Sequence, residues 1–271
     1  MSGRRGYTCI CRGHYIKEYL VIVLVTGASS GFGAAIARRF AAEGHQVIAV
    51  GRRQDRLEKL AAELGRQRVH TMVLDVRERA ATAAAVAALP TCLAEVDVLV
   101  NNAGLALGLE PAQNANLDAW DEMVDTNVKG VMYMTRALLP GMVARNRGHV
   151  INIGSIAGTY AYPGGNVYGA SKAFVRQFSL NLRADLVGSK VRVTDIEPGL
   201  VGGTEFSAVR FKGDAERAAK MYQGADALTP EDVAEAVHWV ATLPARVNIN
   251  AIEMMPVTQT FGALPVHRTS G

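Results

Sequence analysis

A glycine-rich turn between an apolar run and an amphipathic segment is the feature that most constrains the fold of this chain. Residues 20–25 form a continuous run of Val, Leu and Ile, which is typical of a strand buried in a parallel sheet. Residues 34–42 place Ile36 and Phe40 four positions apart, which is the spacing of one helix face. The turn between them, Thr26–Gly33, has the sequence T-G-A-S-S-G-F-G. A strand, a tight turn and a helix are therefore predicted at the start of the fold.

The same alternation of strand and helix continues along the chain. Further strands are predicted at residues 47–50, 69–74, 96–100, 150–153, 191–196 and 252–255. Helices are predicted at residues 55–64, 80–89, 117–127, 129–145 and 167–187, and a last one begins at Thr229-Pro230, where a cap precedes a proline. This pattern predicts an α/β fold with a single Rossmann-type, doubly wound parallel sheet of about seven strands and helices on both faces.

The domain organisation follows from the absence of a linker. No Pro/Ser-rich stretch or change in composition interrupts residues 21–271, so one domain is expected there. Residues 1–20 lack any periodicity and are interpreted as a disordered or non-native N-terminal extension. Cys9, Cys11 and His14 lie there, but they lack a fourth ligand and the usual zinc spacing, so no metal site is expected.

Composition excludes several classes of protein. With 49% hydrophobic and 20% charged residues, the 271-residue chain resembles an ordinary globular protein with a large core. No apolar run approaches the ~18–20 residues of a membrane span, and no secretory signal is recognisable. Three cysteines indicate a reducing compartment, and a cytoplasmic location is expected. The net charge of +4 is scattered, so we expect a small-molecule substrate rather than a nucleic acid.

The glycine turn predicts a dinucleotide site. Glycines at this position permit a tight turn and a close approach of a pyrophosphate to the helix N-terminus, where free N–H groups favour anions. The residues expected to form this cradle are Gly27, Ser29, Ser30, Gly31, Phe32 and Gly33. A purely structural turn is the alternative.

The end of the second predicted strand indicates which dinucleotide binds. An NAD site places a carboxylate there for the ribose 2′-hydroxyl, but this chain has Arg52 and Arg53. Guanidinium groups bind phosphate through forked, charge-assisted hydrogen bonds. The sequence therefore predicts NADP, with two solvated arginines as the alternative.

Tyr168 and Lys172 are the candidate catalytic pair. Their i,i+4 spacing places them on one face of the predicted helix, and Ser155 follows the strand at 150–153. A Lys172 ammonium ~4 Å from the phenol would contribute about 4 kcal/mol, enough to lower the Tyr168 pKa by about three units. Tyr168 would then act as general acid and base, and Ser155 would hold the substrate oxygen. The alternatives are a Ser155 turn cap, and a packed phenol beside a surface ammonium.

Several motifs occur together and in order. They are Thr26-Gly27-x-x-x-Gly31-x-Gly33, Asp75-Val76, Asn101-Asn102-Ala103-Gly104, Asn127, Ser155, Tyr168-x-x-x-Lys172 and Pro198-Gly199. From about residue 21 onward the chain resembles the short-chain dehydrogenase/reductase family. The stretches 101–108, 168–183 and 195–206 resemble its bacterial branch of NADP-dependent 3-hydroxy acid dehydrogenases, which oxidise serine and allo-threonine or reduce malonic semialdehyde.

The resemblance implies roles for further residues. Asp75 and Val76 would contact the adenine, and Asn102 the cofactor ribose. Lys172 would also bind the nicotinamide ribose, and Asn127 would hold a water that relays protons, unless it caps a helix from Val128. The nicotinamide side would be formed by Pro198, Gly199, Val201 and Thr204. The family pattern has threonine where this chain has Gly203, which leaves the role of Thr204 open. A homotetramer is also implied.

Residues 200–223 are predicted to form a substrate lid. Phe206 is an apolar anchor of this segment, and Arg210 is our hypothesis for the group that binds a substrate carboxylate. Two rival functions remain open. One is a 3-ketoacyl thioester reductase, which would need a longer acyl channel. The other is a non-catalytic NADP-sensing protein, which would be expected to lack a member of the set Ser155, Tyr168 and Lys172.

Overall fold

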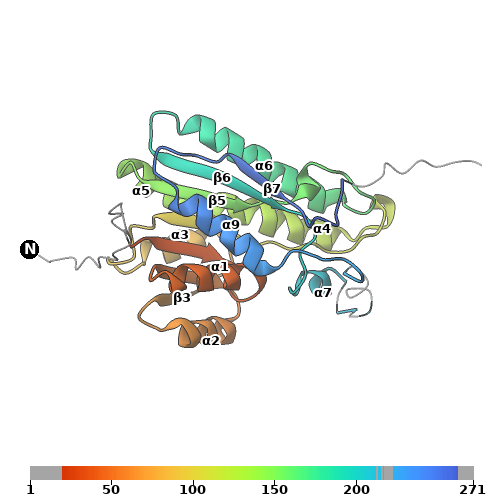
Figure 1. The fold of residues 1–271 in the computed structure, drawn as a ribbon, viewed down its shortest axis with the longest axis horizontal. Coiled ribbons are helices and arrows are strands. Elements are labelled where there is room, and N and C mark those ends of the chain that lie inside the picture. Colours follow the sequence, from red (N-terminus) through yellow and green to blue (C-terminus); the bar gives the residue numbers. More distant parts are fainter. Residues whose placement is uncertain (1–19, 212, 215, 217–221, 262–271) are drawn as a thin grey trace, which may run out of the picture.

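One parallel sheet forms the centre of the computed structural model, which describes residues 20–211, 213–214, 216 and 222–261 (Figure 1). In this part of the chain the sheet has seven strands in the order β3-β2-β1-β4-β5-β6-β7. They are β1 (Ile22–Thr26), β2 (Gln46–Gly51), β3 (Val69–Val73), β4 (Val98–Asn101), β5 (Gly148–Ile153), β6 (Val191–Pro198) and β7 (Ala251–Met254). The predicted doubly wound sheet is confirmed.

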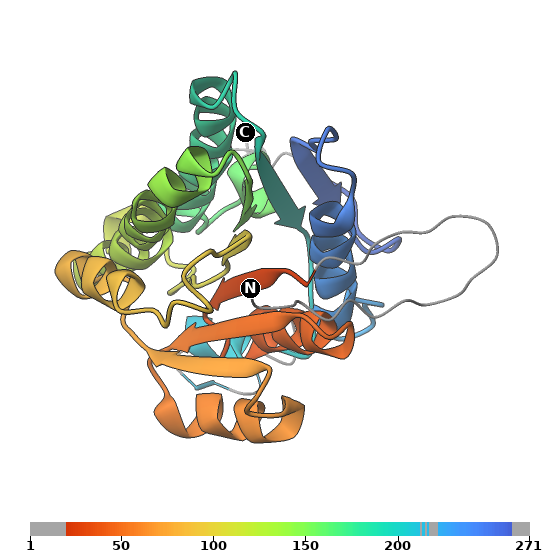
Figure 2. The ribbon, with the colours of Figure 1, turned by 90° about the vertical axis from the view of Figure 1, so that its left-hand side faces the viewer.

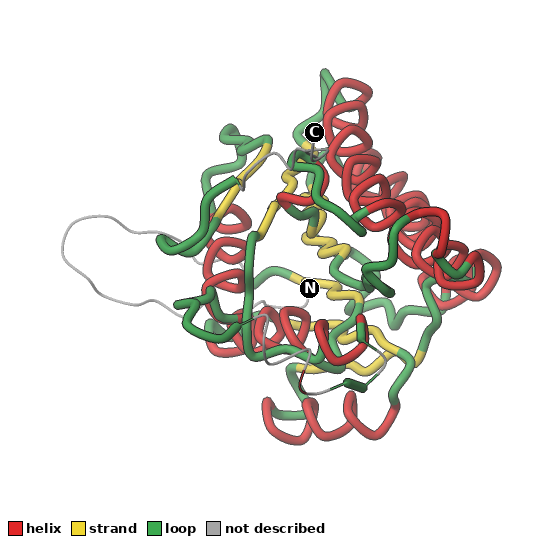
Figure 3. Tube along the Cα trace, turned by 90° about the vertical axis from the view of Figure 1, so that its right-hand side faces the viewer, coloured by secondary structure: helices red, strands yellow, loops and turns green. Residues whose placement is uncertain are grey.

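Helices cover both faces of the sheet, as Figures 2 and 3 show. One hydrophobic core joins one face to α1 (Gly31–Ala42), α2 (Gln54–Leu64) and α9 (Pro230–Thr242). A second core joins the other face to α3 (Arg79–Ala87), α5 (Val131–Ala144) and α6 (Asn166–Asp185). The shorter elements are α4 (Leu117–Val124), α7 (Phe206–Arg210) and the 3₁₀ turns η1 (Ala112–Asn114) and η3 (Ile156–Gly158). None of the described helices has the length and apolarity that a membrane span requires.

The central strand β1 shows why the predicted strands are apolar throughout. Val23, Leu24 and Val25 are all completely buried. Val23 and Val25 belong to one core and Leu24 to the other, because successive side chains of a strand point to opposite faces. A strand covered on both sides therefore needs apolar residues at every position.

The last described helix begins as predicted. Thr229 Oγ1 accepts a hydrogen bond from the Asp232 amide at 3.3 Å, and the Thr229 amide donates to Asp232 Oδ2 at 2.8 Å. Pro230 is the first residue of α9, a position at which a backbone N–H would have no acceptor within the helix, so proline costs no hydrogen bond there.

The predicted break between helices at residues 127 and 129 is wrong. α4 continues through a π-helical turn, η2 (Asp125–Gly130), directly into α5. Gly130 lies so close to the loop after β3 that a Cβ there would be 2.8 Å from Val76 Cγ2. The π turn widens the helix where the loops after β3 and β4 approach it, and such turns are frequent at functional sites.

Candidate active site

A cavity of about 310 Å³ lies at the carboxyl ends of the strands. The strand order reverses between β1 and β4, and ligands of open α/β sheets bind at such a switch point. Many of the predicted site residues line it: Gly27, Ser29, Ser30, Gly31, Phe32, Arg52, Arg53, Asp75, Val76, Asn102, Tyr168, Lys172, Thr204 and Phe206. The folded chain therefore assembles most of the predicted site in one place.

The glycine turn leaves no room for side chains. Gly27 and Gly31 have φ values of 69° and 52°, which favour glycine. A Cβ on Gly33 would lie 2.4 Å from the Gly27 carbonyl oxygen, and a Cβ on Gly27 would lie 2.9 Å from Asn102 Nδ2. Ser30, the residue before α1, makes no side-chain cap to the first helical amides. The turn thus has the shape and the N-terminal amides that a pyrophosphate requires.

The loop after β4 is tied to this turn. Thr26 Oγ1 accepts hydrogen bonds from the amides of Asn102 and Ala103, both at 2.9 Å. Asn102 Nδ2 donates to the Thr26 carbonyl oxygen at 2.8 Å. These bonds hold Asn102 at the cavity wall beside the predicted pyrophosphate cradle.

At the far end of the cavity, Arg53 joins three segments. Its Nη2 donates to Ser30 Oγ at 2.8 Å and to Ser29 Oγ at 3.1 Å, and its Nη1 donates to Glu205 Oε2 at 2.8 Å. Arg56 Nη1 donates to the other oxygen of Glu205 at 2.6 Å. These hydrogen bonds lower the Glu205 pKa to about 2, so its carboxylate is charged at neutral pH. The sequence analysis identified neither Glu205 nor Arg56.

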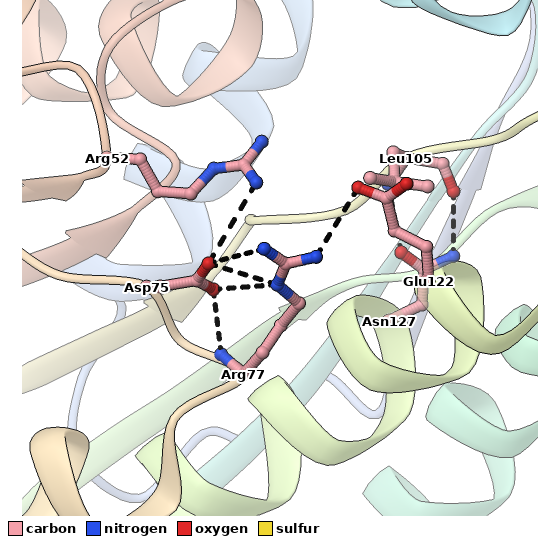
Figure 4. Close-up of polar contacts among 6 residues, drawn as sticks. All are labelled: Arg52, Asp75, Arg77, Leu105, Glu122 and Asn127. Carbon is pink, nitrogen blue, oxygen red and sulfur yellow. Dashed lines mark hydrogen bonds and ion pairs between the residues drawn. The ribbon is translucent and has the colours of Figure 1, made fainter. Parts of the chain in front are cut away.

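Asp75 is engaged by a neighbouring arginine that the sequence analysis also missed (Figure 4). Arg77 donates to the Asp75 carboxylate from Nη2 at 2.6 Å and from Nε at 3.0 Å, and its Nη1 lies 3.5 Å from Glu122 Oε1. Burial opposes ionisation of Asp75, but the bonds from Arg77 outweigh it and lower the Asp75 pKa. Arg52 is more exposed, with its Nη1 3.9 Å from Asp75 Oδ2. This charged group forms the wall beside the predicted adenine position.

Tyr168 and Lys172 both lie on α6 and face inward. They are 8% and 7% exposed, which excludes the alternative of a surface ammonium. Lys172 Nζ donates to the Ile153 carbonyl oxygen at 2.7 Å, so the end of β5 holds the ammonium in place. Ser155 Oγ accepts from the Ala157 amide at 3.1 Å, and its interaction with Tyr168 lowers the pKa of that phenol. Ser155 therefore caps the η3 turn and also acts on Tyr168.

Burial shifts the pKa values of both groups. It raises the Tyr168 pKa to about 12, against the opposing effects of Ser155 and the Arg210 charge. It also lowers the Lys172 pKa to about 8, against the charge of Asp195. Lys172 Nζ lies 6.0 Å from the Tyr168 ring centroid and bonds to Ile153. The expected lowering of the Tyr168 pKa by Lys172 together with an oxidised nicotinamide stays a prediction.

Asn127 lies behind the cavity, in the middle of the π turn (Figure 4). Its Oδ1 accepts from the Leu105 amide at 2.9 Å, and its Nδ2 donates to the Leu105 carbonyl oxygen at 2.8 Å and to Ser171 Oγ at 3.0 Å. Its side chain therefore does not cap a helix. A Cβ on Gly104 would lie 3.2 Å from Asn127 Oδ1 and 3.5 Å from Lys172 Nζ, so both groups border the space beside this glycine.

Arg210 of α7 packs against Tyr168, the predicted catalytic residue. Its guanidinium carbon lies 5.6 Å from the Tyr168 ring centroid and 5.5 Å from that of Tyr162. Its Nη2 donates to the Tyr162 hydroxyl at 2.7 Å, its Nε donates to the Gly108 carbonyl oxygen at 3.2 Å, and the residue is 7% exposed. The Phe206 ring meets Tyr168 edge-on at 5.7 Å. Phe206 and Arg210, both predicted to contact substrate, thus pack against the Tyr168 ring.

Asp195 is a buried carboxylate near Lys172 that the sequence analysis did not identify. It is 1% exposed, and neither of its oxygens has a hydrogen-bonding donor among the described residues. A Cβ on Gly154 would lie 2.5 Å from Asp195 Oδ1, so only glycine fits after β5. Burial and the charge of Glu197 raise the Asp195 pKa to about 7. Its charge in turn acts on Lys172.

Comparison with known proteins identifies the family. Residues 21–215 match the sequence pattern of the short-chain dehydrogenases. The chain belongs to the short-chain dehydrogenase family. This dehydrogenase is 68% identical over 249 residues to an NADP-dependent 3-hydroxy acid dehydrogenase of Salmonella typhi, an alignment covering 92% of this chain and all of the relative. It is 51% identical to a serine 3-dehydrogenase of Agrobacterium fabrum, covering 92% of this chain and 98% of that one.

Solved structures agree with these relatives. The closed form of a serine dehydrogenase complexed with NADP⁺ matches the fold with a TM-score of 0.91 and 65% identity, covering 92% of this chain and all of the other. A serine dehydrogenase from Escherichia coli matches with a TM-score of 0.79 and 60% identity, covering 89% and all of the respective chains. The predicted family is therefore confirmed, and this dehydrogenase is an oxidoreductase acting on CH–OH groups.

Of the predicted nicotinamide-side residues of this dehydrogenase, Thr204 lines the cavity, whereas Pro198, Gly199 and Val201 are not among its lining residues. Thr204 Cγ2 lies 3.5 Å from the position of a Cβ on Gly31. The Pro198 carbonyl oxygen is 3.5 Å from Ser155 Oγ, the Gly199 amide donates to the Met254 carbonyl oxygen, and Val201 pairs with Leu228. These three therefore hold the base of the segment that leads to Thr204.

No metal centre is formed by the part of the chain that the structure describes, where no group of three His, Cys, Asp or Glu side chains is suitably placed. Cys9, Cys11 and His14 lie outside the described residues.

Proposed function

We propose that this short-chain dehydrogenase uses NADP to interconvert a small 3-hydroxy acid, of the serine, allo-threonine or 3-hydroxypropionate type, with its 3-oxo acid or semialdehyde. The names of the similar dehydrogenases support this substrate class. The single observation that carries the proposal is a buried cation, Arg210, packed against the tyrosine of the family motif. A small hydroxy acid needs both groups, one for its carboxylate and one for its hydroxyl.

The cavity fits the proposed cofactor. The glycine turn and the N-terminus of α1 would hold the pyrophosphate, and Arg53 with Arg52 would hold the 2′-phosphate. Asp75 and Val76 would border the adenine, Asn102 and Lys172 the ribose units, and Thr204 the carboxamide. Most of these residues line one continuous cavity, which supports the assignment. When bound, the nicotinamide supplies the hydride in reduction and accepts it in oxidation.

Tyr168 performs the proton transfer. In reduction its phenol is protonated at neutral pH and donates the proton to the carbonyl oxygen, while Ser155 Oγ–H stabilises the negative charge that develops there. In oxidation the phenol must ionise, and the positive charges beside it, including Arg210, favour that state. Lys172 would restore the proton balance, because its pKa of about 8 allows it to exchange a proton near neutral pH.

Asn127 would support the proton path without touching substrate. Its side chain is fixed by Leu105 and Ser171, and its Oδ1 borders the same space as Lys172 Nζ. We propose that a water in this space connects Lys172 to solvent. This space exists because residue 104 is a glycine, which has no side chain to fill it.

Arg210 would orient the substrate. Its hydrogen bonds to Tyr162 and Gly108 fix the guanidinium, and a fixed fork binds a carboxylate in one orientation. Of the predicted lid at residues 200–223, positions 212, 215 and 217–221 lie outside the described residues. Within its described part, Phe206 would exclude water from the reacting carbon. A long acyl thioester has no carboxylate for Arg210, which disfavours the ketoacyl reductase alternative.

The test is an absorbance assay of nicotinamide reduction with serine and with a matched 3-hydroxy compound that lacks the carboxylate. Arg210→Ala should raise the Michaelis constant for serine by on the order of a hundredfold, because a charged hydrogen-bonded partner is lost. Turnover of the carboxylate-free alcohol should fall much less, because that substrate loses only the effect of the Arg210 charge on Tyr168. An unchanged Michaelis constant for serine would contradict the role of Arg210, and absence of any NADP-linked turnover of 3-hydroxy acids would contradict the function.

We also propose a homotetrameric, cytoplasmic enzyme. Apolar side chains stay exposed on the α5 and α6 layer, among them Met132 at 40%, Leu180 at 42% and Val187 at 78%. Exposed apolar patches of this kind mark interfaces between subunits. Light scattering on the purified chain tests the assembly, and a monomer at micromolar concentration would contradict it.

A further inference from the structure

Glu205 is an anion placed among the arginines of the proposed 2′-phosphate site. It lies directly before α7, whereas Arg53 and Arg56 lie 152 and 149 residues earlier at the start of α2. Each of its carboxylate oxygens accepts one guanidinium bond, at 2.8 Å from Arg53 and 2.6 Å from Arg56. All three side chains are exposed to a similar degree, between 40% and 43%, so they are accessible to a ligand from solvent.

The arrangement around Glu205 is that of an oxyanion site. Arg53 contacts the carboxylate with one nitrogen and the hydroxyls of Ser29 and Ser30 with another. Two guanidinium groups that each bind one oxygen of a shared anion are equally suited to a carboxylate and to a phosphate. A phosphate carries more charge and more acceptor oxygens, so it can displace the carboxylate.

We propose that Glu205 tunes cofactor specificity by competing with the 2′-phosphate of NADP for Arg53 and Arg56. This inference rests on the proposed function, since it assumes that NADP binds at this end of the cavity. It adds Arg56 to the groups that bind the phosphate. The competition applies to NADP and not to NAD, because NAD has a neutral 2′-hydroxyl at this position.

The competition links the cofactor to the substrate side of the cavity. Glu205 is covalently joined to Phe206, whose ring packs on Tyr168, and α7 ends in Arg210. While Glu205 holds Arg53 and Arg56, it ties this short helix to α2. A 2′-phosphate that takes over the two arginines releases that tie, so NADP should change the position of α7 more than NAD does.

The decisive measurement is calorimetric binding of paired ligands to the wild-type chain and to Glu205→Gln. The pairs are NADP⁺ with NAD⁺, and 2′,5′-ADP with 5′-AMP, which differ by the 2′-phosphate alone. Glu205→Gln removes the competing charge but keeps the shape, so it should bind NADP⁺ and 2′,5′-ADP on the order of tenfold more tightly. The affinities for NAD⁺ and 5′-AMP should stay at their wild-type values.

Glu63→Gln is the matched control. Glu63 forms an ion pair with Arg38 at 2.7 Å and is 44% exposed, so the variant removes one carboxylate of similar exposure from a place outside the cavity. It should leave all four affinities unchanged. This control separates the local competition from the general effect of one negative charge less.

The outcomes distinguish the inference from the function on which it rests. A wild-type chain that prefers NAD⁺ to NADP⁺ overturns the cofactor assignment and, with it, the competition. A wild-type chain that prefers NADP⁺, with no gain or a loss of NADP⁺ affinity in Glu205→Gln, overturns the competition alone. An equal gain for NADP⁺ and NAD⁺ also overturns it, since the effect would then not depend on the 2′-phosphate.

Discussion

The two ends of the cavity hold their charged groups by different physical means. At the end with the proposed proton transfer, Tyr168 and Lys172 are less than a tenth exposed, and burial shifts the pKa values of both toward their neutral forms. At the end with the proposed phosphate site, Arg53 and Glu205 are about two-fifths exposed and form an ion pair, and the arginines hold the Glu205 pKa at about 2. Burial thus shifts protonation at one end, whereas ion pairing holds the charged groups at the other.

The largest effect should come from the buried end. Tyr168→Phe removes the hydroxyl but keeps the ring that packs on Phe206 and Arg210. Loss of a general acid and base should lower kcat/KM for serine by roughly 10²–10⁴-fold. The affinity for NADP⁺, measured by calorimetry, should stay the same. Residual activity near the wild-type value would show that another group moves the proton.

Asp195→Asn tests the effect of burial through the pH dependence of the free energy of unfolding. The Asp195 pKa is raised from 3.8 to about 7, so the native state holds this proton more tightly than the unfolded state does. Its contribution to stability is therefore complete below about pH 4 and is lost as the pH rises to about 7.

Asparagine has no such proton to lose. The free energy of unfolding of Asp195→Asn, relative to wild type, should thus grow between acid and neutral pH by on the order of 2–4 kcal/mol. Urea unfolding at a series of pH values measures it. If the free energies of unfolding of wild type and Asp195→Asn differed by the same amount at every pH in this range, the raised Asp195 pKa would be contradicted.

Arg53→Ala tests the exposed end. Removing its hydrogen bonds should weaken NADP⁺ binding by roughly tenfold to a hundredfold and leave NAD⁺ binding nearly unchanged. Since the interaction is exposed, the difference should shrink as salt is added. Fluorescence titration of both cofactors at low and high ionic strength measures this. Equal weakening of both cofactors would place the 2′-phosphate elsewhere.

The smallest effect should come from an exposed ion pair that borders no ligand. Arg38 and Glu63 are 47% and 44% exposed, and they join α1 to α2 on the surface. Arg38→Gln should change the free energy of unfolding by about 0.5 kcal/mol or less, as is usual for such pairs. Thermal unfolding measures the change. A decrease in the free energy of unfolding several times larger would mean that exposed ion pairs stabilise this fold more than we expect.

Local patterns in the sequence predicted the sheet and much of the cavity. The βα alternation, the glycine turn and the spacing of Tyr168 and Lys172 are each set by neighbours in the chain, so periodicity reveals them. The π turn at Asp125–Gly130 was missed because the residues around it have ordinary helical character. The burial of Tyr168 and Lys172 and the bond from Lys172 to Ile153 were not predicted, because the spacing places the pair on one face but does not specify their surroundings.

The sequence by itself determined the family and the doubly wound sheet, and it predicted the residues that we propose carry the chemistry. Only the tertiary structure decided their electrostatic surroundings. Glu205 reaches Arg53 across 152 residues, and Asp195 lies against Gly154 on a neighbouring strand. Contacts of this kind leave no periodic trace in the chain, because they depend on which loops meet at the carboxyl edge of the sheet. The burial of each site residue and the charges around it depend on how these loops pack together. Burial and neighbouring charges in turn set the protonation and the ion pairing of the site.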